Sequence, residues 1–261
     1  MRLLVTRPRD QAESWCAQLR AQGVAAEMLP LIAIGPPADA APLRDAWAGL
    51  GTTAFVMFVS ANAASGFFAA RPTGADWPMQ TLAGSTGPGT TAALRALGVP
   101  ATCIADPPRE AAQFDSEALW RVIAARPWQG AHALVVRGEQ GRDWLADQLR
   151  AQGARLSFVE AYRRSVPQLS AGEQALLREA LDAPADRVWL FSSSQAVQHL
   201  QQLAPGADWS RSTAWATHAR IAQAAREAGF GTVQALAATV DAVVVAWGRA
   251  LQSAPTPAQR R

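Results

Sequence analysis

The sequence predicts an α/β protein made of two doubly wound lobes, and two observations support this fold class. Short continuous apolar runs, such as residues 55–59 and 188–191, alternate with stretches of helical periodicity, such as that of Trp15 and Leu19. This alternation is typical of parallel strands covered by helices on both faces. The order of these units also repeats along the chain. We therefore expect two parallel, Rossmann-like sheets of similar size.

The repeat has a nearly constant offset. The apolar run that ends at Arg7 has its counterpart in the run that ends at Arg137, 130 residues later. In each half, two helix-like stretches stop at a glycine, where a left-handed C-cap is expected. These glycines are Gly23 and Gly98 in the first half, and Gly153 and Gly229 in the second.

Two strand-like stretches with prolines at or near their ends, residues 30–37 and 159–167, interrupt the repeat. They occupy similar places in the two halves, and we interpret them as the connections between the lobes. Two lobes joined by a two-stranded linker would leave a cleft between them. Clefts at domain interfaces are preferred ligand sites, so we expect the functional site there.

The composition excludes several kinds of mechanism. The chain has no lysine, so all 24 basic residues are arginine. This excludes a Schiff-base lysine and the lysine of a P-loop, whereas arginine suits carboxylate or phosphate because its planar fork bonds two oxygens at once. The net charge is only +3 and no basic run exceeds two residues, so we expect no nucleic-acid partner.

The sequence also carries no signal for a cofactor, a metal or a membrane. The loop at Gly87-Pro88-Gly89 lacks the third glycine of a dinucleotide fingerprint. We expect no membrane partner and a cytoplasmic location, because no apolar run has the length of a membrane span or a secretory signal. The protein is expected to be a monomer. The few histidines and cysteines have no metal-ligand spacing: Cys16, Cys103, His132, His199 and His218.

Short motifs in a defined order extend from Met1 to about Gly231. They are Val5-Thr6-Arg7-Pro8, Phe58-Val59-Ser60-Ala61-Asn62, Gly87-Pro88-Gly89-Thr90, Phe114-Asp115-Ser116-Glu117, Arg137-Gly138-Glu139 with Gly141-Arg142, Tyr162-Arg163-Arg164 and Phe191-Ser192-Ser193. In the order and spacing of these motifs the chain resembles the uroporphyrinogen-III synthase family. One departure is the counterpart of the glycine loop, Thr217-His218-Ala219-Arg220, which has no glycine.

The resemblance implies a domain division and a reaction. One lobe would comprise residues 1–35 plus 166–261, and the other residues 38–160. The substrate would be hydroxymethylbilane, a linear tetrapyrrole with eight carboxylates. The enzyme would close it into a ring with loss of water and with the last pyrrole inverted, and it would use no cofactor.

Eight carboxylates require many hydrogen-bond donors, and polar residues follow the predicted strands where helices begin. Backbone N–H groups and the dipole at such positions favour anions. The candidate binding residues are Thr6, Arg7, Ser60, Asn62, Thr90, Arg137, Ser192 and Ser193. Two alternatives remain open: the hydroxyl and amide side chains can be simple helix caps, and the arginines can form structural ion pairs.

The candidate proton donor to the departing hydroxyl is Tyr162, the only tyrosine. It lies in the second predicted connection, from which its hydroxyl could reach the cleft. The alternative is a tyrosine that only packs a linker strand. His218 is a weaker candidate for the same role, with a cap or surface role as its alternative.

Two other functions fit two lobes with a cleft. A small-molecule binding protein that acts as a sensor would have the same fold, but it usually brings a DNA-binding segment or a secretion signal. A nucleotide-sugar glycosyltransferase would need a glycine-rich phosphate loop, which the sequence lacks. The sequence therefore favours the cyclising enzyme.

Overall fold

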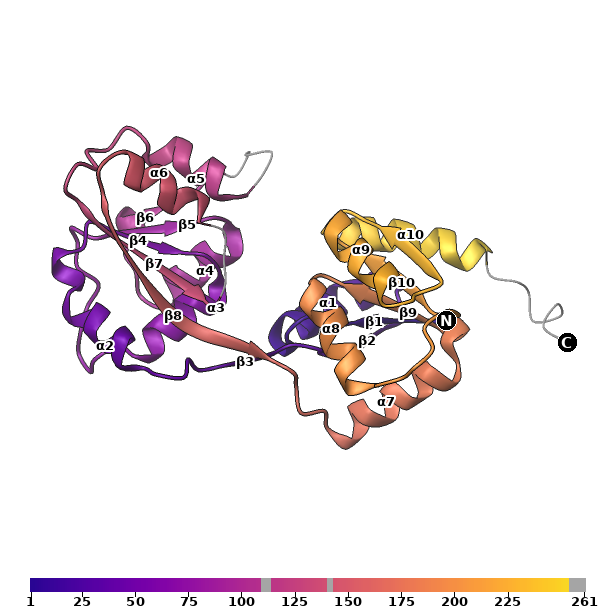
Figure 1. Cartoon of the computed structure of the whole chain (residues 1–261). Helices are drawn as coiled ribbons and strands as arrows, with labels where there is room; N and C mark the ends of the chain where they lie inside the picture. The colour runs from indigo at the N-terminus through magenta and orange to yellow at the C-terminus, as the bar shows by residue number, and fades with distance from the viewer. Residues whose placement is uncertain (109–113, 140–142, 254–261) are drawn as a thin grey trace, which may run out of the picture. The chain divides into compact units, whose positions relative to one another are not determined.

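The computed structural model describes residues 1–108, 114–139 and 143–253 (Figure 1). Strands and helices alternate along the chain, and the predicted α/β class is confirmed. The chain divides into two compact units, which we call unit 1 and unit 2. Unit 1 comprises Met1–Ala33 and Ser165–Arg261, and unit 2 comprises Ile34–Arg164.

Unit 1 is built on a parallel sheet with the strand order β11-β10-β9-β1-β2. Its strands are β1 (Arg2–Val5), β2 (Ala26–Met28), β9 (Arg187–Phe191), β10 (Thr213–Ala216) and β11 (Thr232–Ala235). Its helices are α1 (Arg9–Ala21), α7 (Ala171–Asp182), α8 (Ser194–Leu203), α9 (Ala219–Glu227) and α10 (Val240–Ser253), with the 3-10 helix η3 (Pro184–Asp186).

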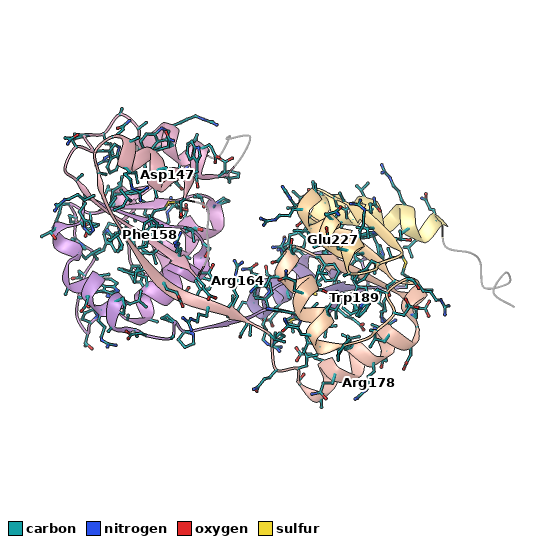
Figure 2. All side chains as sticks on the ribbon, in the orientation of Figure 1. Asp147, Phe158, Arg164, Arg178, Trp189 and Glu227 are labelled. Atoms are coloured by element: carbon teal, nitrogen blue, oxygen red, sulfur yellow. The ribbon has the colours of Figure 1, made fainter. Side chains whose placement is uncertain are left out.

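The two faces of this sheet bury alternate residues of β9. Val188 and Leu190 pack in one cluster with residues of α1 and α10. The alternate residue Trp189, labelled in Figure 2, lies on the other face. It stacks with Phe191 and meets the ring of Trp209 edge to face. Because both faces are covered, β9 reads as a continuous apolar run in the sequence.

Unit 2 is built on a second sheet with the strand order β3-β8-β7-β4-β5-β6. Its strands are β3 (Ala33–Gly35), β4 (Phe55–Phe58), β5 (Leu82–Ser85), β6 (Ile104–Ala105), β7 (His132–Gly138) and β8 (Arg155–Ser165). Its helices are α2 (Ala41–Ala48), α3 (Ala61–Ala69), α4 (Pro88–Ala96), α5 (Ser116–Ile123) and α6 (Trp144–Ala151), with the 3-10 helices η1 (Leu50–Thr52) and η2 (Ala101–Cys103).

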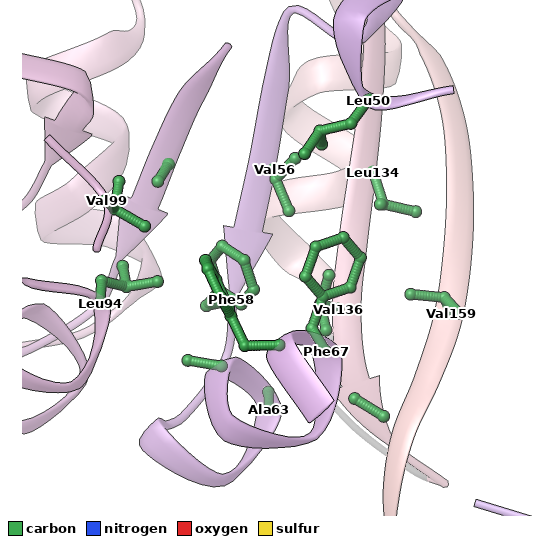
Figure 3. Packing of buried hydrophobic residues seen from close by; sticks show 14 of the residues in the cluster. Leu50, Val56, Phe58, Ala63, Phe67, Leu94, Val99, Leu134, Val136 and Val159 are labelled. Carbon is green, nitrogen blue, oxygen red and sulfur yellow. The ribbon is translucent and has the colours of Figure 1, made fainter. Parts of the chain in front are cut away.

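The core of unit 2 has two layers, one on each face of the sheet. Val56 and Phe58 of β4 pack with Phe67 of α3 on the face that α2, α3 and α4 cover (Figure 3). Phe55 and Met57 of the same strand pack on the other face, in a cluster with residues of α5 and α6. Burial of large side chains on both faces is the main driving force that holds such a sheet and its helices together.

The helix ends and the two predicted connections agree with the sequence analysis. Left-handed φ angles of 79°, 93°, 84° and 95° confirm the expected caps at Gly23, Gly98, Gly153 and Gly229.

The chain passes between the two units after Ala33 and after Arg164, inside the stretches 30–37 and 159–167 that we interpreted as connections. The strands of these stretches, β3 and β8, are neighbours. β8 begins at Arg155 and pairs with β7 as far as Tyr162, which lies opposite Gly138. The first part of the second connection, residues 159–162, therefore belongs to the unit 2 sheet.

A hydrogen-bonded row crosses the amino end of the unit 2 sheet. His132 bonds Thr53 Oγ1 through Nδ1 at 3.1 Å and Ser157 Oγ through Nε2 at 2.8 Å. The Thr53 hydroxyl also donates to the carbonyl of Gly49, so it accepts from His132 Nδ1–H. His132 Nε2 then accepts from Ser157, an arrangement that requires the neutral imidazole.

The hydrogen bonds of neutral His132 predict that the free energy of unfolding depends on pH. Burial, and then the charge of Arg155, lower the pKa of His132 below 6.5 in the folded protein. The unfolded chain therefore binds the proton more readily, so the free energy of unfolding should fall as the pH drops below about 6.5. Urea unfolding at pH 7.5 and 5.5 should show a smaller loss for His132→Gln than for the parent. His218→Gln, at an exposed position, is the matched control and should behave like the parent. An equal loss in the parent and in His132→Gln would contradict this account.

Candidate active site

Each sheet has one point at which the strand order reverses direction. In unit 1 the chain leaves β1 toward β2 on one side, while β9 and β10 follow on the other side. In unit 2 the chain runs from β4 to β5 and β6 on one side, and β7 and β8 lie on the other. In open parallel sheets, ligands bind outside the carboxyl ends of the strands at such switch points. The candidate positions are therefore the ends of β1 and β9, and the ends of β4 and β7.

At the end of β1, Thr6 and Arg7 have different environments. Thr6 is buried, and its backbone N–H and its hydroxyl both donate to the carbonyl of Leu190 in β9, the hydroxyl at 2.8 Å. Its side chain is thus used within the fold, where it fixes the turn before α1. Arg7 is half-buried, and its guanidinium carbon lies 4.0 Å from the centre of the Trp15 ring. Burial lowers the pKa of Arg7 to about 10, so it remains charged at neutral pH.

At the end of β9, three consecutive serines lead into α8. Ser193 caps the helix, since its side chain accepts the N–H of Gln195 at 3.2 Å. Ser192 is half-buried in the same turn. Ser194 was not among the predicted residues, although its Oγ atom is buried without a hydrogen-bond partner in the described part of the chain. An unsatisfied buried polar atom at a switch point is what a ligand-binding turn would show before the ligand arrives.

In unit 2, Ser60 caps α3 and accepts the N–H of Ala63 at 3.2 Å. Asn62 is half-buried and lies in the first turn of the same helix. Thr90 lies in the first turn of α4, is buried, and is preceded by Gly87 as the N-cap residue. The cap interpretation therefore applies to the side chains of Ser60 and Ser193, while Asn62 and Thr90 lie inside helices.

Tyr162 has a well-defined place at the β4–β7 switch point. It is only 4% exposed and packs in the cluster on the α3 face of the sheet. Its ring lies against Gly138, where a Cβ atom would come within 2.9 Å of the ring carbon Cζ. Its hydroxyl lies 3.4 Å from Ser60 Oγ and accepts a hydrogen bond from Arg164 at 3.3 Å. The structure thus brings two predicted site residues together, and Arg164 is an additional neighbour of Tyr162. Arg164 lies near the end of β8, where Figure 2 labels it.

Arg137 is the counterpart of Arg7, but it is neutralised within unit 2. It forms an ion pair with Asp143 and lies over the ring of Phe158, with 4.5 Å between the guanidinium carbon and the ring centre. Gly141 and Arg142, which belong to the same sequence motif, lie outside the described residues. The structural ion pair that we held open for both arginines is therefore present for Arg137. Among the described residues Arg7 has none.

The loop between β5 and α4 is held by a small polar network that the sequence did not reveal. Thr91 donates to Asp106 at 2.8 Å and lies 3.0 Å from Ser85, whose Oγ also accepts the N–H of Gly87. These contacts fix the backbone around Gly87.

At the corresponding loop of unit 1, the cap is His218, whose Nδ1 accepts the N–H of Arg220 at 3.1 Å. The histidine thus replaces the glycine as N-cap residue.

Two further findings concern the described residues alone. No group of three or more histidine, cysteine, aspartate or glutamate side chains is arranged to hold a metal ion in this part of the chain. None of the helices that the structure describes combines the length and the apolar character needed to cross a membrane.

Comparisons with known proteins give a consistent result. The model of the family described as "Uroporphyrinogen-III synthase HemD" matches residues 13–244. A uroporphyrinogen-III synthase of Escherichia coli K12 is 30% identical over 242 residues, which cover 90% of this chain and 94% of the relative. One from Synechococcus elongatus is 32% identical over 216 residues, covering 80% and 77%.

Solved structures share the fold. A mutant uroporphyrinogen-III synthase of the extremely thermophilic bacterium Thermus thermophilus has a TM-score of 0.58 at 19% identity, and the match covers 97% of this chain and 100% of that one. The enzyme of Helicobacter pylori 26695 also has a TM-score of 0.58, at 16% identity, with 96% and 100% covered. At these identities the likeness supports the fold alone.

The fold and the residues at its switch points define a two-unit parallel α/β protein in which several helices begin at the carboxyl ends of the strands. Helix starts of this kind favour anions in general. The family model and the relatives give this class a name: the chain belongs to the uroporphyrinogen-III synthase family. It is therefore a cyclising lyase of porphyrin and haem biosynthesis.

Proposed function

We propose that this chain cyclises hydroxymethylbilane to the type III macrocycle. The hydroxyl of the terminal hydroxymethyl group takes up a proton and leaves as water, and the remaining carbon becomes an electrophilic azafulvene. The substituted carbon of the last pyrrole then attacks this centre to give a spiro intermediate. One carbon–carbon bond of that intermediate breaks, and the ring recloses in the inverted orientation with loss of a proton. Membership of the family is the observation that carries this proposal.

The carboxylates of the substrate are proposed to bind at the carboxyl edges of the two sheets. Backbone N–H groups in the first turns of α1, α3, α4 and α8 point toward these edges, and the helix dipoles favour negative charge there. Arg7 adds a charged donor that has no ion-pair partner among the described residues. Arg137 would contribute less, because Asp143 already balances its charge. The proposed binding set remains Thr6, Arg7, Ser60, Asn62, Thr90, Arg137, Ser192 and Ser193. Both donors of Thr6 are bonded to the Leu190 carbonyl, so Thr6 would act by holding the turn before α1 in place.

Control of geometry is the main task of such an enzyme. Simple head-to-tail closure needs no enzyme and gives the symmetric type I isomer, so the protein must favour one mode of closure over an easy competitor. Correct orientation of reacting groups is worth about 7–11 kcal/mol in favourable cases. Many distributed donors can supply this orientation without a metal or cofactor. In this proposal residues 1–35 plus 166–261 and residues 38–160 act as the two substrate-binding lobes of a cytoplasmic monomer.

Tyr162 is proposed to protonate the leaving hydroxyl. Its oxygen accepts from Arg164 and lies at the limit of hydrogen-bond distance from Ser60, so its own hydrogen is free to be donated. A phenol is a weak acid, with a reference pKa near 10, but a donor held at one place by Gly138 and β7 loses little entropy when it acts.

The first experiment tests the activity itself. Purified protein that is incubated with hydroxymethylbilane, without added metal or cofactor, should give predominantly the type III isomer. Chromatography of the oxidised products separates type III from type I. If only type I appears, as in buffer, the proposed function is wrong.

The second experiment tests the proton donor. Tyr162→Phe should slow the formation of type III product by up to about 100-fold, the low end of the range for general acid catalysis. Single alanine changes at Ser60, Thr90 or Ser193 should each cost a factor of about 2–13, because backbone donors remain in place. Thermal unfolding should show a loss of about 1 kcal/mol for the two caps, Ser60 and Ser193, and so identify effects on folding. A parental rate in Tyr162→Phe, together with a severe loss in a serine or threonine variant, would contradict the assignment.

A further inference from the structure

The guanidinium of Arg7 is a partly desolvated charge without a counter-charge among the residues that the structure describes. Its Nε atom is buried and has no hydrogen-bond partner in the described part of the chain, and no described carboxylate forms an ion pair with it. Burial is the cause that lowers the pKa of Arg7 to about 10; a nearby carboxylate would act in the opposite direction. Isolated buried charges are costly, so their retention calls for a specific reason.

The duplication supplies an internal comparison. Arg137, at the same place in the second repeat, is neutralised by Asp143, six residues further along. The residue six positions after Arg7 is also acidic, Glu13, but it is exposed and forms no ion pair with Arg7. The difference is local: α1 already begins at Arg9, whereas α6 begins only at Trp144. Glu13 is therefore carried into a helix, while Asp143 remains in the turn where it can reach its arginine.

What Arg7 contacts instead is an aromatic ring. Trp15 lies on α1 and is half-buried, with part of its surface against the core cluster of unit 1. The guanidinium carbon of Arg7 lies 4.0 Å from the centre of its ring. A tryptophan face attracts a cation through its quadrupole, and stacking restrains the plane of the guanidinium. Because stacking uses the face of the guanidinium, the N–H donors along its edge stay available.

We infer that Trp15 is a positioning residue for Arg7, which it holds charged, oriented and unpaired for a carboxylate of the substrate. An ion pair would satisfy the same donors that a carboxylate requires, whereas an aromatic ring leaves them free. The carboxylate would also meet the first turn of α1, whose N-cap residue, Pro8, makes no side-chain cap hydrogen bond. This inference rests on the proposed function, since it takes the ligand to be a polycarboxylate.

The test compares Trp15→Leu, Trp15→Phe and Arg7→Gln in steady-state kinetics with hydroxymethylbilane. Trp15→Leu should raise KM about five-fold, the change expected when a cation–π contact at an exposed to partly buried site is lost. The value of kcat should change by less than about two-fold. Trp15→Phe keeps a ring and should recover most of the parental KM. In the Arg7→Gln background Trp15→Leu should have little further effect, because the partner that it positions is gone.

A matched control comes from the second repeat. Phe158→Leu removes the ring beneath Arg137, but Asp143 still holds that arginine, so KM should remain within about two-fold of the parent. Equal KM values for the parent and Trp15→Leu, or additive effects of Trp15→Leu and Arg7→Gln, would overturn the inference. So would a loss in Trp15→Leu that appears only as reduced kcat and a lower thermal midpoint, since this is the pattern of a purely structural role.

A binding measurement separates this inference from the proposed function. Uroporphyrin III, the oxidised octacarboxylate product, can be titrated by fluorescence without turnover. If the parent binds it and Trp15→Leu and Arg7→Gln each weaken the binding about five-fold, the positioning role is supported even if the parent yields only type I product. If the parent makes type III product and the variants bind uroporphyrin III like the parent, the positioning role is wrong and the proposed function stands.

Discussion

Parallel strand pairing is the constraint on which the rest of this structure depends. Because β1, β9 and β10 run in the same direction, each connection from a strand to a helix emerges at the same edge of the unit 1 sheet, and the same holds for β4, β5 and β7 in unit 2. The free N–H groups of several helix starts are thereby gathered at one edge. The fold thus creates an edge of the kind that favours anions before any side chain is considered.

The two duplicated halves share this backbone arrangement but differ in the side chains at equivalent strand and helix ends. Arg7 is stacked on Trp15 and remains unpaired among the described residues, while Arg137 is balanced by Asp143. Gly87 caps α4, while His218 occupies the corresponding cap of α9. Such differences give the two units unlike residues at equivalent strand and helix ends. A substrate whose four rings must be told apart from one another requires this inequality.

Much of the fold could be predicted because it depends on local patterns. Strands buried on both faces give continuous apolar runs, and the four glycine caps were found because L-residues avoid the left-handed region. The place of Tyr162 could not be predicted in the same way. The prolines near its stretch correctly indicated a connection between the units, but they did not indicate that Tyr162 still pairs with β7 in the unit 2 sheet. Gly138 opposite its ring was the available signal, since only glycine leaves room there.

The environments of individual site residues were hardest to predict, since they depend on where helices begin. The Arg7–Trp15 contact joins residues eight positions apart, and it exists because α1 begins at Arg9. Trp15 and Leu19 share one helical spacing in the sequence, yet only Leu19 is a core residue. Trp15 is half-exposed and its ring lies beneath the guanidinium of Arg7. Likewise, Thr6 looked like a binding residue in the sequence, and only the tertiary contact with Leu190 shows that its hydroxyl is occupied.

The central claim is that helix starts at the carboxyl edges bind the carboxylates, and amide hydrogen exchange tests it most directly. N–H groups such as those of Asn62, Gly89 and Ser194 lie in first turns, where a helix provides no internal acceptor. Exchange is to be followed residue by residue with and without uroporphyrin III. The account predicts slower exchange at these amides and unchanged exchange in the loops at the opposite, amino edges of both sheets. Protection confined to the amino edges, or bound uroporphyrin III without protection of any helix start, would contradict it.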